Sequence, residues 1–306
     1  MKAGAPRQAV ATALVVLALA APVEAASRFW PAPGTKEPPA APGTSQSAPT
    51  GEAVRLQLSD RGSHYEVAVR NHAPGPMQVR LALARASNLR AVPALPLEAV
   101  LPPGAQQVLA RLYPLDPRQD ARFDLDLRQL PGDPRARPAD VEYRLPLDHQ
   151  QVRVDQAFGG RFSHADAENH YAVDFAVPEG TPVLAAREGT VLQVEGGVRD
   201  AGGPAAANAT RANHVRILHD DGSMALYAHL QPDGVLVRVG ERVRQGQRIG
   251  LSGNTGFSTA PHLHFVVQVN AGMALRAIPF RMHGPQGELR FAREDAAPAP
   301  GSAALP

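Results

Sequence analysis

Two histidines that alternate with apolar residues form the most chemically informative string of the sequence, because residues 261–265 read PHLHF. Successive side chains of a β-strand point to opposite faces, so residues two apart share a face. His262 and His264 should therefore project together, while the apolar residues beside them enter a core. Two imidazoles side by side on one strand face suit a metal ligand next to a catalytic base.

Two further strings place reactive side chains among strand-forming residues. YAVDF at 171–175 contains Asp174, and LYAHL at 226–230 contains His229. A catalytic zinc takes three protein ligands from His, Asp or Glu and leaves one position open for water. The chain has no cysteine, which excludes thiolate ligands. The strings therefore supply a three-ligand zinc site with spare histidines for proton transfer.

These three strings, in this order and with the glycines between them, resemble the M23 family of zinc metallopeptidases, the LytM/lysostaphin-type cell-wall endopeptidases. The resemblance covers roughly residues 155–282 and includes DFAVPEGTPV at 174–183 and GQRIGLSGNTG at 246–256. It implies a LytM-type antiparallel β-sheet peptidase domain and a Zn²⁺ cofactor. It also implies that peptidoglycan stem peptides or cross-bridges are the substrate.

The first metal ligand is either of two histidines. His170 stands four residues before Asp174, the common family spacing, whereas His164 follows Ser163 as in one branch of the family. Residues four apart in an extended strand are about 13 Å apart, too far to share one zinc. His170 would need a bend after it, while a loop could return His164 freely. The sequence favours His164 and keeps His170 as the alternative.

The resemblance also implies a role for each of the remaining groups. Asp174 and His264 complete the metal site, and zinc lowers the pKa of its water towards neutrality. His262 is the general base, and His229 beside it orients the water or stabilises the tetrahedral intermediate. The strand pattern places Tyr227 on the same face as His229. The candidate substrate contacts are Tyr227, Asn254, Thr255 and Ser258.

The chain of 306 residues predicts about two domains. Lys2 and Arg7 precede an apolar run that ends in small residues, the pattern of an export signal. The expected segments are a signal peptide at 1–26, a proline-rich linker at 27–51, an accessory domain at 52–148, a peptidase domain at 150–283 and a disordered Ala/Pro-rich tail at 284–306. The apolar run is too short for a permanent membrane anchor, so the protein should be periplasmic or secreted.

The accessory domain shows period-two patterns separated by proline- and glycine-rich turns, for example VRLQL at 54–58 and YEVAV at 65–69. Short strands with frequent turns predict an immunoglobulin-like β-sandwich, so the whole chain should be all-β. Nothing in this region resembles a catalytic constellation. It is expected to space, cover or target the peptidase domain.

The formal net charge is only +2, which is too small to indicate nucleic-acid binding. Two functions from different classes follow. One is a zinc endopeptidase that hydrolyses peptidoglycan cross-links, and the other is a catalytically inactive LytM-type regulator that activates another cell-wall hydrolase. Such regulators typically lack a metal or catalytic residue, whereas this chain keeps every string. The sequence therefore favours the enzyme, with a wall hydrolase or divisome protein as a possible partner.

Overall fold

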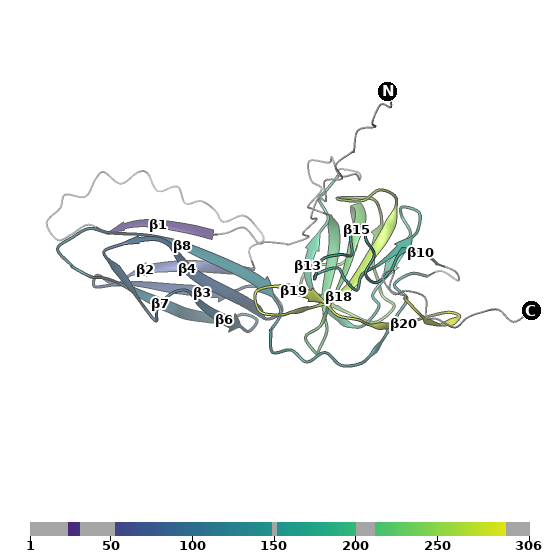
Figure 1. Ribbon diagram of the computed structural model, residues 1–306, viewed down its shortest axis with the longest axis horizontal. Helices are drawn as coiled ribbons and strands as arrows, with labels where there is room; N and C mark the ends of the chain where they lie inside the picture. Colours follow the sequence, from purple (N-terminus) through teal and green to yellow (C-terminus); the bar gives the residue numbers. More distant parts are fainter. Residues whose placement is uncertain (1–23, 31–52, 149–151, 200–211, 292–306) are drawn as a thin grey trace, which may run out of the picture.

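The computed structural model describes residues 24–30, 53–148, 152–199 and 212–291, and every regular element in these ranges is a β-strand. The all-β prediction is confirmed. Figure 1 shows two domains placed end to end along the long axis of the molecule. None of the described segments is a long apolar helix of the kind that spans a bilayer. Most of the predicted signal peptide and linker lies outside the described residues.

The accessory domain contains two four-stranded sheets. The first has the order β1 (Glu24–Trp30), β8 (Ala121–Pro131), β4 (Met77–Ser87) and β6 (Leu97–Leu101). The second has the order β2 (Val54–Asp60), β3 (Tyr65–Asn71), β7 (Gln106–Pro114) and β5 (Leu89–Val92). Apolar side chains of both sheets, including Val67, Leu81, Leu112 and Leu125, meet in one core. The two sheets form a sandwich, and its likeness to immunoglobulin domains stays a prediction.

The second domain is built on one large antiparallel sheet. Its central path runs β10 (Arg153–Gln156), β11 (Val173–Ala176), β18 (His262–Asn270), β15 (Met224–Val235), β14 (Asn213–Leu218), β13 (Gly189–Glu195) and β16 (Arg242–Val243). Three shorter strands pair beside this path: β12 (Pro182–Leu184), β17 (Arg248–Ser252) and β19 (Leu275–Ala277). The three strings that carry the candidate site residues thus lie on, or at the end of, three adjacent strands.

The register of β11, β18 and β15 decides which side chains share a face. His264 of β18 lies opposite Asp174 of β11 and opposite Ala228 of β15. Residues directly opposite in an antiparallel pair point to the same side of the sheet. The neighbouring pair Tyr227 and Phe265 points to the other side, where both rings are buried in the domain core. One face therefore carries the candidate site and the other carries the core.

Strand pairing crosses three of the predicted boundaries, because residues beyond each of them join the neighbouring sheet. β9 (Glu142–Arg144), within the predicted accessory domain, pairs with β20 (Arg281–Gly284), and Tyr143 joins the second core. β21 (Gly287–Leu289) pairs with β20 inside the predicted disordered tail. Beyond it, the Phe291 ring packs against the Phe158 ring, with 5.3 Å between their centroids. In the opposite direction, residues 27–30 of the predicted linker lie in β1.

The two domains touch through close backbone contacts. A Cβ atom on Gly75 would come within 2.7 Å of a Leu218 methyl carbon, so the turn before β4 lies directly against β14. The backbone N–H of Met273 donates to the Gln78 side-chain oxygen at 2.8 Å. The accessory domain contributes no described residue to the wall of the candidate site. This contact therefore holds the domains together without forming part of the pocket.

Candidate metal centre

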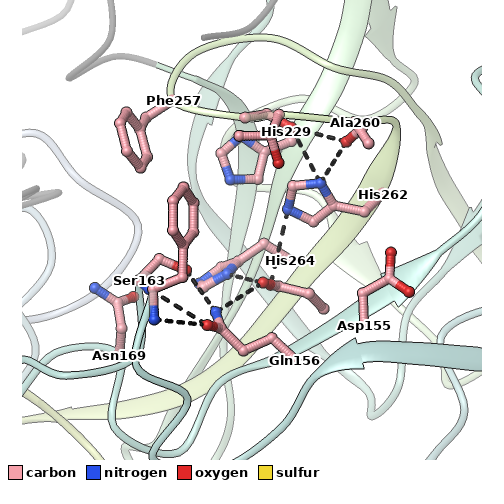
Figure 2. A pocket seen from close by; sticks show the side chains of 13 residues that line it. Asp155, Gln156, Ser163, Asn169, His229, Phe257, Ala260, His262 and His264 are labelled. Carbon is pink, nitrogen blue, oxygen red and sulfur yellow. Dashed lines mark hydrogen bonds and ion pairs between the residues drawn. The ribbon is translucent and has the colours of Figure 1, made fainter. Parts of the chain in front are cut away.

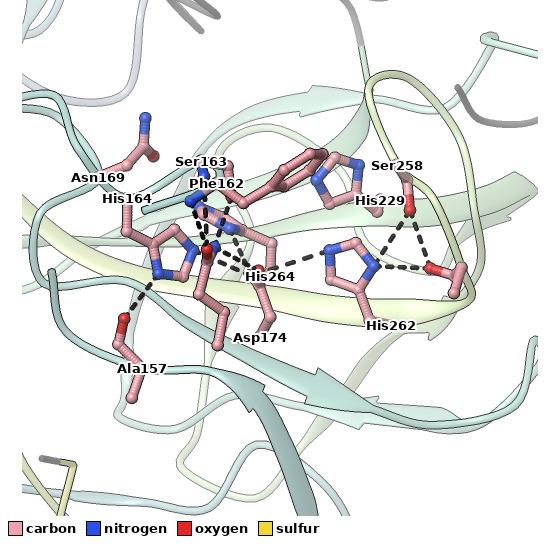
Figure 3. A network of polar contacts seen from close by, with 12 residues as sticks. Ala157, Phe162, Ser163, His164, Asn169, Asp174, His229, Ser258, His262 and His264 are labelled. Atoms are coloured by element: carbon pink, nitrogen blue, oxygen red, sulfur yellow. Dashed lines mark hydrogen bonds and ion pairs between the residues drawn. The ribbon is translucent and has the colours of Figure 1, made fainter. Parts of the chain in front are cut away.

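Three side chains from separate parts of the chain converge on the face of the sheet opposite the main core. His164 comes from the loop between β10 and β11, Asp174 from β11 and His264 from β18. Each offers one ligand atom, and these atoms lie within 4.8 Å of one another (Figure 3). All three residues are buried, with 0%, 8% and 3% of their surface exposed, respectively.

The Asp174 carboxylate is the centre of this cluster. Its Oδ1 atom lies 2.8 Å from His264 Nδ1 and 3.2 Å from His164 Nε2. Burial acts to raise the pKa of Asp174, but its close contacts with the His164 and His264 rings outweigh it and hold that pKa well below its ordinary value. The aspartate is therefore ionised, as a metal ligand must be.

The unpaired atoms of the cluster fit a bound cation. His164 Nε2 and His264 Nε2 are buried and have no hydrogen-bond partner among the described atoms. His164 Nδ1 lies 2.9 Å from the Ala157 carbonyl oxygen. A carbonyl can only accept, so this nitrogen carries the proton and leaves the lone pair on Nε2. Two imidazoles and one carboxylate are a donor set that Zn²⁺ takes in catalytic sites.

His170, the alternative first ligand, does not reach the cluster. β11 begins only at Val173, and the half-buried His170 ring packs edge-on against Tyr171 at 4.8 Å between centroids. The structure therefore brings His164, and not His170, to Asp174 and His264. The preference drawn from the sequence rested on the Ser163-His164 string of one family branch and on the bend that His170 would need, and the loop before β11 brings His164 to the cluster.

Replacing His164 with alanine should lower zinc affinity about a hundred- to a thousand-fold. The estimate takes one ligand to contribute about a quarter of the roughly 10–16 kcal/mol of binding free energy in four-ligand zinc sites. His170→Ala is the matched control and should leave the affinity unchanged. Competition with a chromogenic chelator would measure both dissociation constants. Loss of affinity in His170→Ala alone would return the ligand role to His170.

His262 lies beside the cluster with one nitrogen directed to it. Its Nε2 atom is 3.8 Å from Asp174 Oδ1, and its Nδ1 atom is 2.8 Å from the Ala260 carbonyl oxygen. The carbonyl requires Nδ1 to carry the hydrogen in the neutral ring, which leaves a lone pair on Nε2. The His262 side chain is 14% exposed, so solvent and ligands can reach it.

His229 reaches the site because the backbone turns there. Its φ is 62°, in the left-handed region that non-glycine residues rarely adopt. This turn breaks the alternation of β15, and the His229 ring comes to lie 4.6 Å from the His262 ring. His229 Nδ1 lies 2.7 Å from the Thr255 carbonyl oxygen. Burial lowers the pKa of His229 to about 3, so the ring is neutral.

The prediction that Tyr227 contacts substrate is wrong. The Tyr227 side chain is fully buried in the core, and its hydroxyl accepts a hydrogen bond from the Ala186 backbone N–H at 2.8 Å. Regular alternation along β15 would put Tyr227 and His229 on one face, but the positive φ at His229 separates them. The strand pattern could not reveal this turn, because a period of two assumes a regular strand backbone.

The three polar residues expected before β18 have different positions. Thr255 is buried, and its hydroxyl donates to the Leu230 carbonyl at 2.7 Å. The Thr255 backbone carbonyl accepts from His229, so Thr255 positions this histidine. Asn254 does not line the pocket. Ser258 does line it, and its Oγ lies 3.1 Å from His262 Nδ1. A substrate contact by Ser258 stays a prediction.

A cavity of about 220 Å³ opens over Asp174, His229, His262 and His264. Figure 2 shows the side chains that wall it. The sequence reasoning missed eight of them: Asp155, Gln156, Phe162, Ser163, Asn169, Phe257, Thr259 and Ala260. The two phenylalanine rings stack at 5.5 Å between centroids, although Phe162 is 63% exposed. A phenylalanine two positions before a candidate ligand was the available sequence cue.

A buried cluster of two histidines and an aspartate, open on one side to two further histidines, is the type of site that a metallopeptidase contains. Residues 168–275 match the model of Peptidase family M23, and this part of the chain belongs to that family. The match includes Asp174, His229, His262 and His264 and begins after His164.

The chain is similar to peptidoglycan DD-endopeptidase ShyA of Vibrio cholerae, with 35% identity over 152 residues that cover 48% of this chain and 32% of ShyA. It is also similar to glycyl-glycine endopeptidase ALE-1 of Staphylococcus capitis, with 43% identity over 104 residues, 34% of this chain and 25% of ALE-1. The solved structure of lysostaphin from Staphylococcus simulans is 34% identical in the matched region. The match covers 42% of this chain and 47% of the lysostaphin chain, with a TM-score of 0.31. The chain thus spans less than half the length of each relative.

Proposed function

We propose that the second domain is a zinc-dependent endopeptidase that hydrolyses peptide cross-links of bacterial peptidoglycan. The observation that supports this most strongly is the buried cluster of His164, Asp174 and His264 with His262 at its open side. The M23 match supports a peptidase, and relatives named as peptidoglycan endopeptidases support the substrate class. The predicted export signal would deliver the protein to that substrate.

His164, Asp174 and His264 would hold the metal. Zn²⁺ supplies Lewis acidity, which polarises a peptide carbonyl and makes water nucleophilic near neutral pH. The three ligands come from two neighbouring strands and one loop, so the folded sheet fixes their separation before any metal binds. Such a site needs little rearrangement on binding.

His262 would move the proton. Its Nε2 lone pair faces the cavity, while the Ala260 carbonyl holds the proton on Nδ1. In this tautomer Nε2 accepts a proton from the attacking water and can pass it to the leaving amine. The ring sits in contact with solvent, so it can return to its starting state after each turnover.

His229 would orient the water. The two roles expected from the sequence were orientation of water and stabilisation of the tetrahedral intermediate. The only N–H of the neutral ring is donated to the Thr255 carbonyl, so Nε2 is an acceptor. An acceptor can align the hydrogen of a water molecule, but it cannot donate to a developing oxyanion. The hydrogen bonding therefore favours the first role.

Mass spectrometry of purified sacculi treated with the protein tests the function and names the bond that is cut. We expect new peptide ends that vanish in the presence of a zinc chelator. Relatives named for DD-endopeptidase and for glycyl-glycine endopeptidase activity define the two products to look for first. Zinc-loaded protein that releases no peptide would instead support the inactive regulator, and its partner would then be sought among other wall hydrolases.

A further inference from the structure

Gln156 is a buried glutamine at the end of β10 whose carboxamide is fully engaged beside the cluster. It is 9% exposed. Its Nε2 donates to Ser163 Oγ at 2.7 Å and to Asp174 Oδ2 at 3.2 Å. We infer that Gln156 is a positioning residue of the metal centre, and that it fastens the loop carrying His164 to the carboxylate of Asp174. This inference rests on the proposed metal site.

The first part of this role is to orient the Asp174 carboxylate. Oδ1 of Asp174 faces His164 and His264 (Figure 3), whereas Oδ2 accepts a hydrogen bond from Gln156. A donor on Oδ2 resists rotation of the carboxylate and keeps Oδ1 directed at the cluster. Groups that hold metal ligands in this way typically change metal affinity about 10- to 100-fold when they are lost.

The second part is to hold the loop. Gln156 Oε1 accepts from the backbone N–H groups of Phe162 at 3.0 Å and Ser163 at 3.4 Å, the two residues directly before His164. His164 has no strand of its own, since it lies between β10 and β11. One side chain therefore constrains two metal ligands that belong to different elements, and it does so from the cavity wall seen in Figure 2.

The local backbone is adapted to this arrangement. The pairing of β10 with β11 shifts register between Val154 and Gln156, and the shift places Gln156 directly opposite Asp174. Bulges of this kind commonly redirect a side chain beside a functional site. Gly160 passes so close that a Cβ there would lie 2.1 Å from Gln156 Cγ. Only glycine lets the loop reach the carboxamide.

The test replaces Gln156 with methionine, which has similar length and volume but can neither donate to Asp174 nor accept from the loop. We expect the zinc dissociation constant of the full-length protein to rise about 10- to 100-fold. We also expect the visible absorption of the Co²⁺-loaded protein to change, because the geometry of the ligands changes. Ser163→Ala removes one contact of the carboxamide and should produce a smaller change in the same direction.

Gln129→Met is the matched control. Gln129 is also buried, and it accepts a hydrogen bond from the Val54 backbone N–H in the accessory domain at 2.8 Å. Its loss should lower the stability of that domain and leave zinc affinity and the Co²⁺ spectrum unchanged. Unchanged affinity and spectrum in Gln156→Met, with normal zinc binding by the unaltered protein, would overturn the positioning role alone. Absence of zinc binding by the unaltered protein would overturn the metal site itself.

Discussion

Replacing His264 with alanine should make the protein lose its zinc on dialysis and stop the release of peptides from sacculi. His264 pairs with Asp174 across β18 and β11, and its Nε2 is buried without a partner. Removing this ligand should weaken zinc binding about a hundred- to a thousand-fold, as expected for His164→Ala, because each ligand contributes a similar part of the binding free energy. Metal content after dialysis and peptide release under the same conditions would measure the two effects together.

His283→Ala is a suitable control for the His264 variant. His283 belongs to the same domain, but it lies on β20 and faces Glu142 at 3.4 Å, away from the cavity. It should retain zinc and activity. Thermal unfolding of the metal-free proteins would show whether His264→Ala keeps its fold, since the change leaves Asp174 with one fewer buried partner. Full zinc content in a folded His264→Ala protein would contradict the ligand assignment.

Replacing His262 with alanine should separate chemistry from metal binding. The variant should keep its zinc, because the cluster of His164, Asp174 and His264 stays complete. Its turnover should fall about 10²- to 10⁴-fold, the usual contribution of a general acid–base group. The loss should appear in kcat, with KM little changed, because the proton moves only as the reaction proceeds.

Ser258→Ala gives the comparison for the His262 variant. It removes the hydroxyl 3.1 Å from His262 Nδ1, but the Ala260 carbonyl at 2.8 Å still holds the ring and its tautomer. Activity should therefore fall much less than in His262→Ala. A His262→Ala enzyme that works within a few-fold of the unaltered protein would remove His262 from the proposed mechanism. Loss of zinc in that variant would make His262 a ligand instead.

Much of the candidate site follows from local pattern. The period of two in residues 261–265 was sufficient to put His262 and His264 on one face, because a strand leaves its side chains no other arrangement. The same rule placed Asp174 on a strand and predicted an all-β chain. The preference for His164 over His170 came from the Ser163-His164 string of one family branch together with the length of an extended strand.

The tertiary structure alone decided the rest. The turn at His229 brings this ring to the site while Tyr227 stays in the core, and the ring is held there by the Thr255 carbonyl of a distant loop. The position of Gln156 opposite Asp174 depends on a bulge between two strands. The domain boundaries depend on β9 and β21 meeting at β20. A sequence pattern reports the environment of neighbouring residues, whereas each of these features results from contacts between segments far apart in the chain.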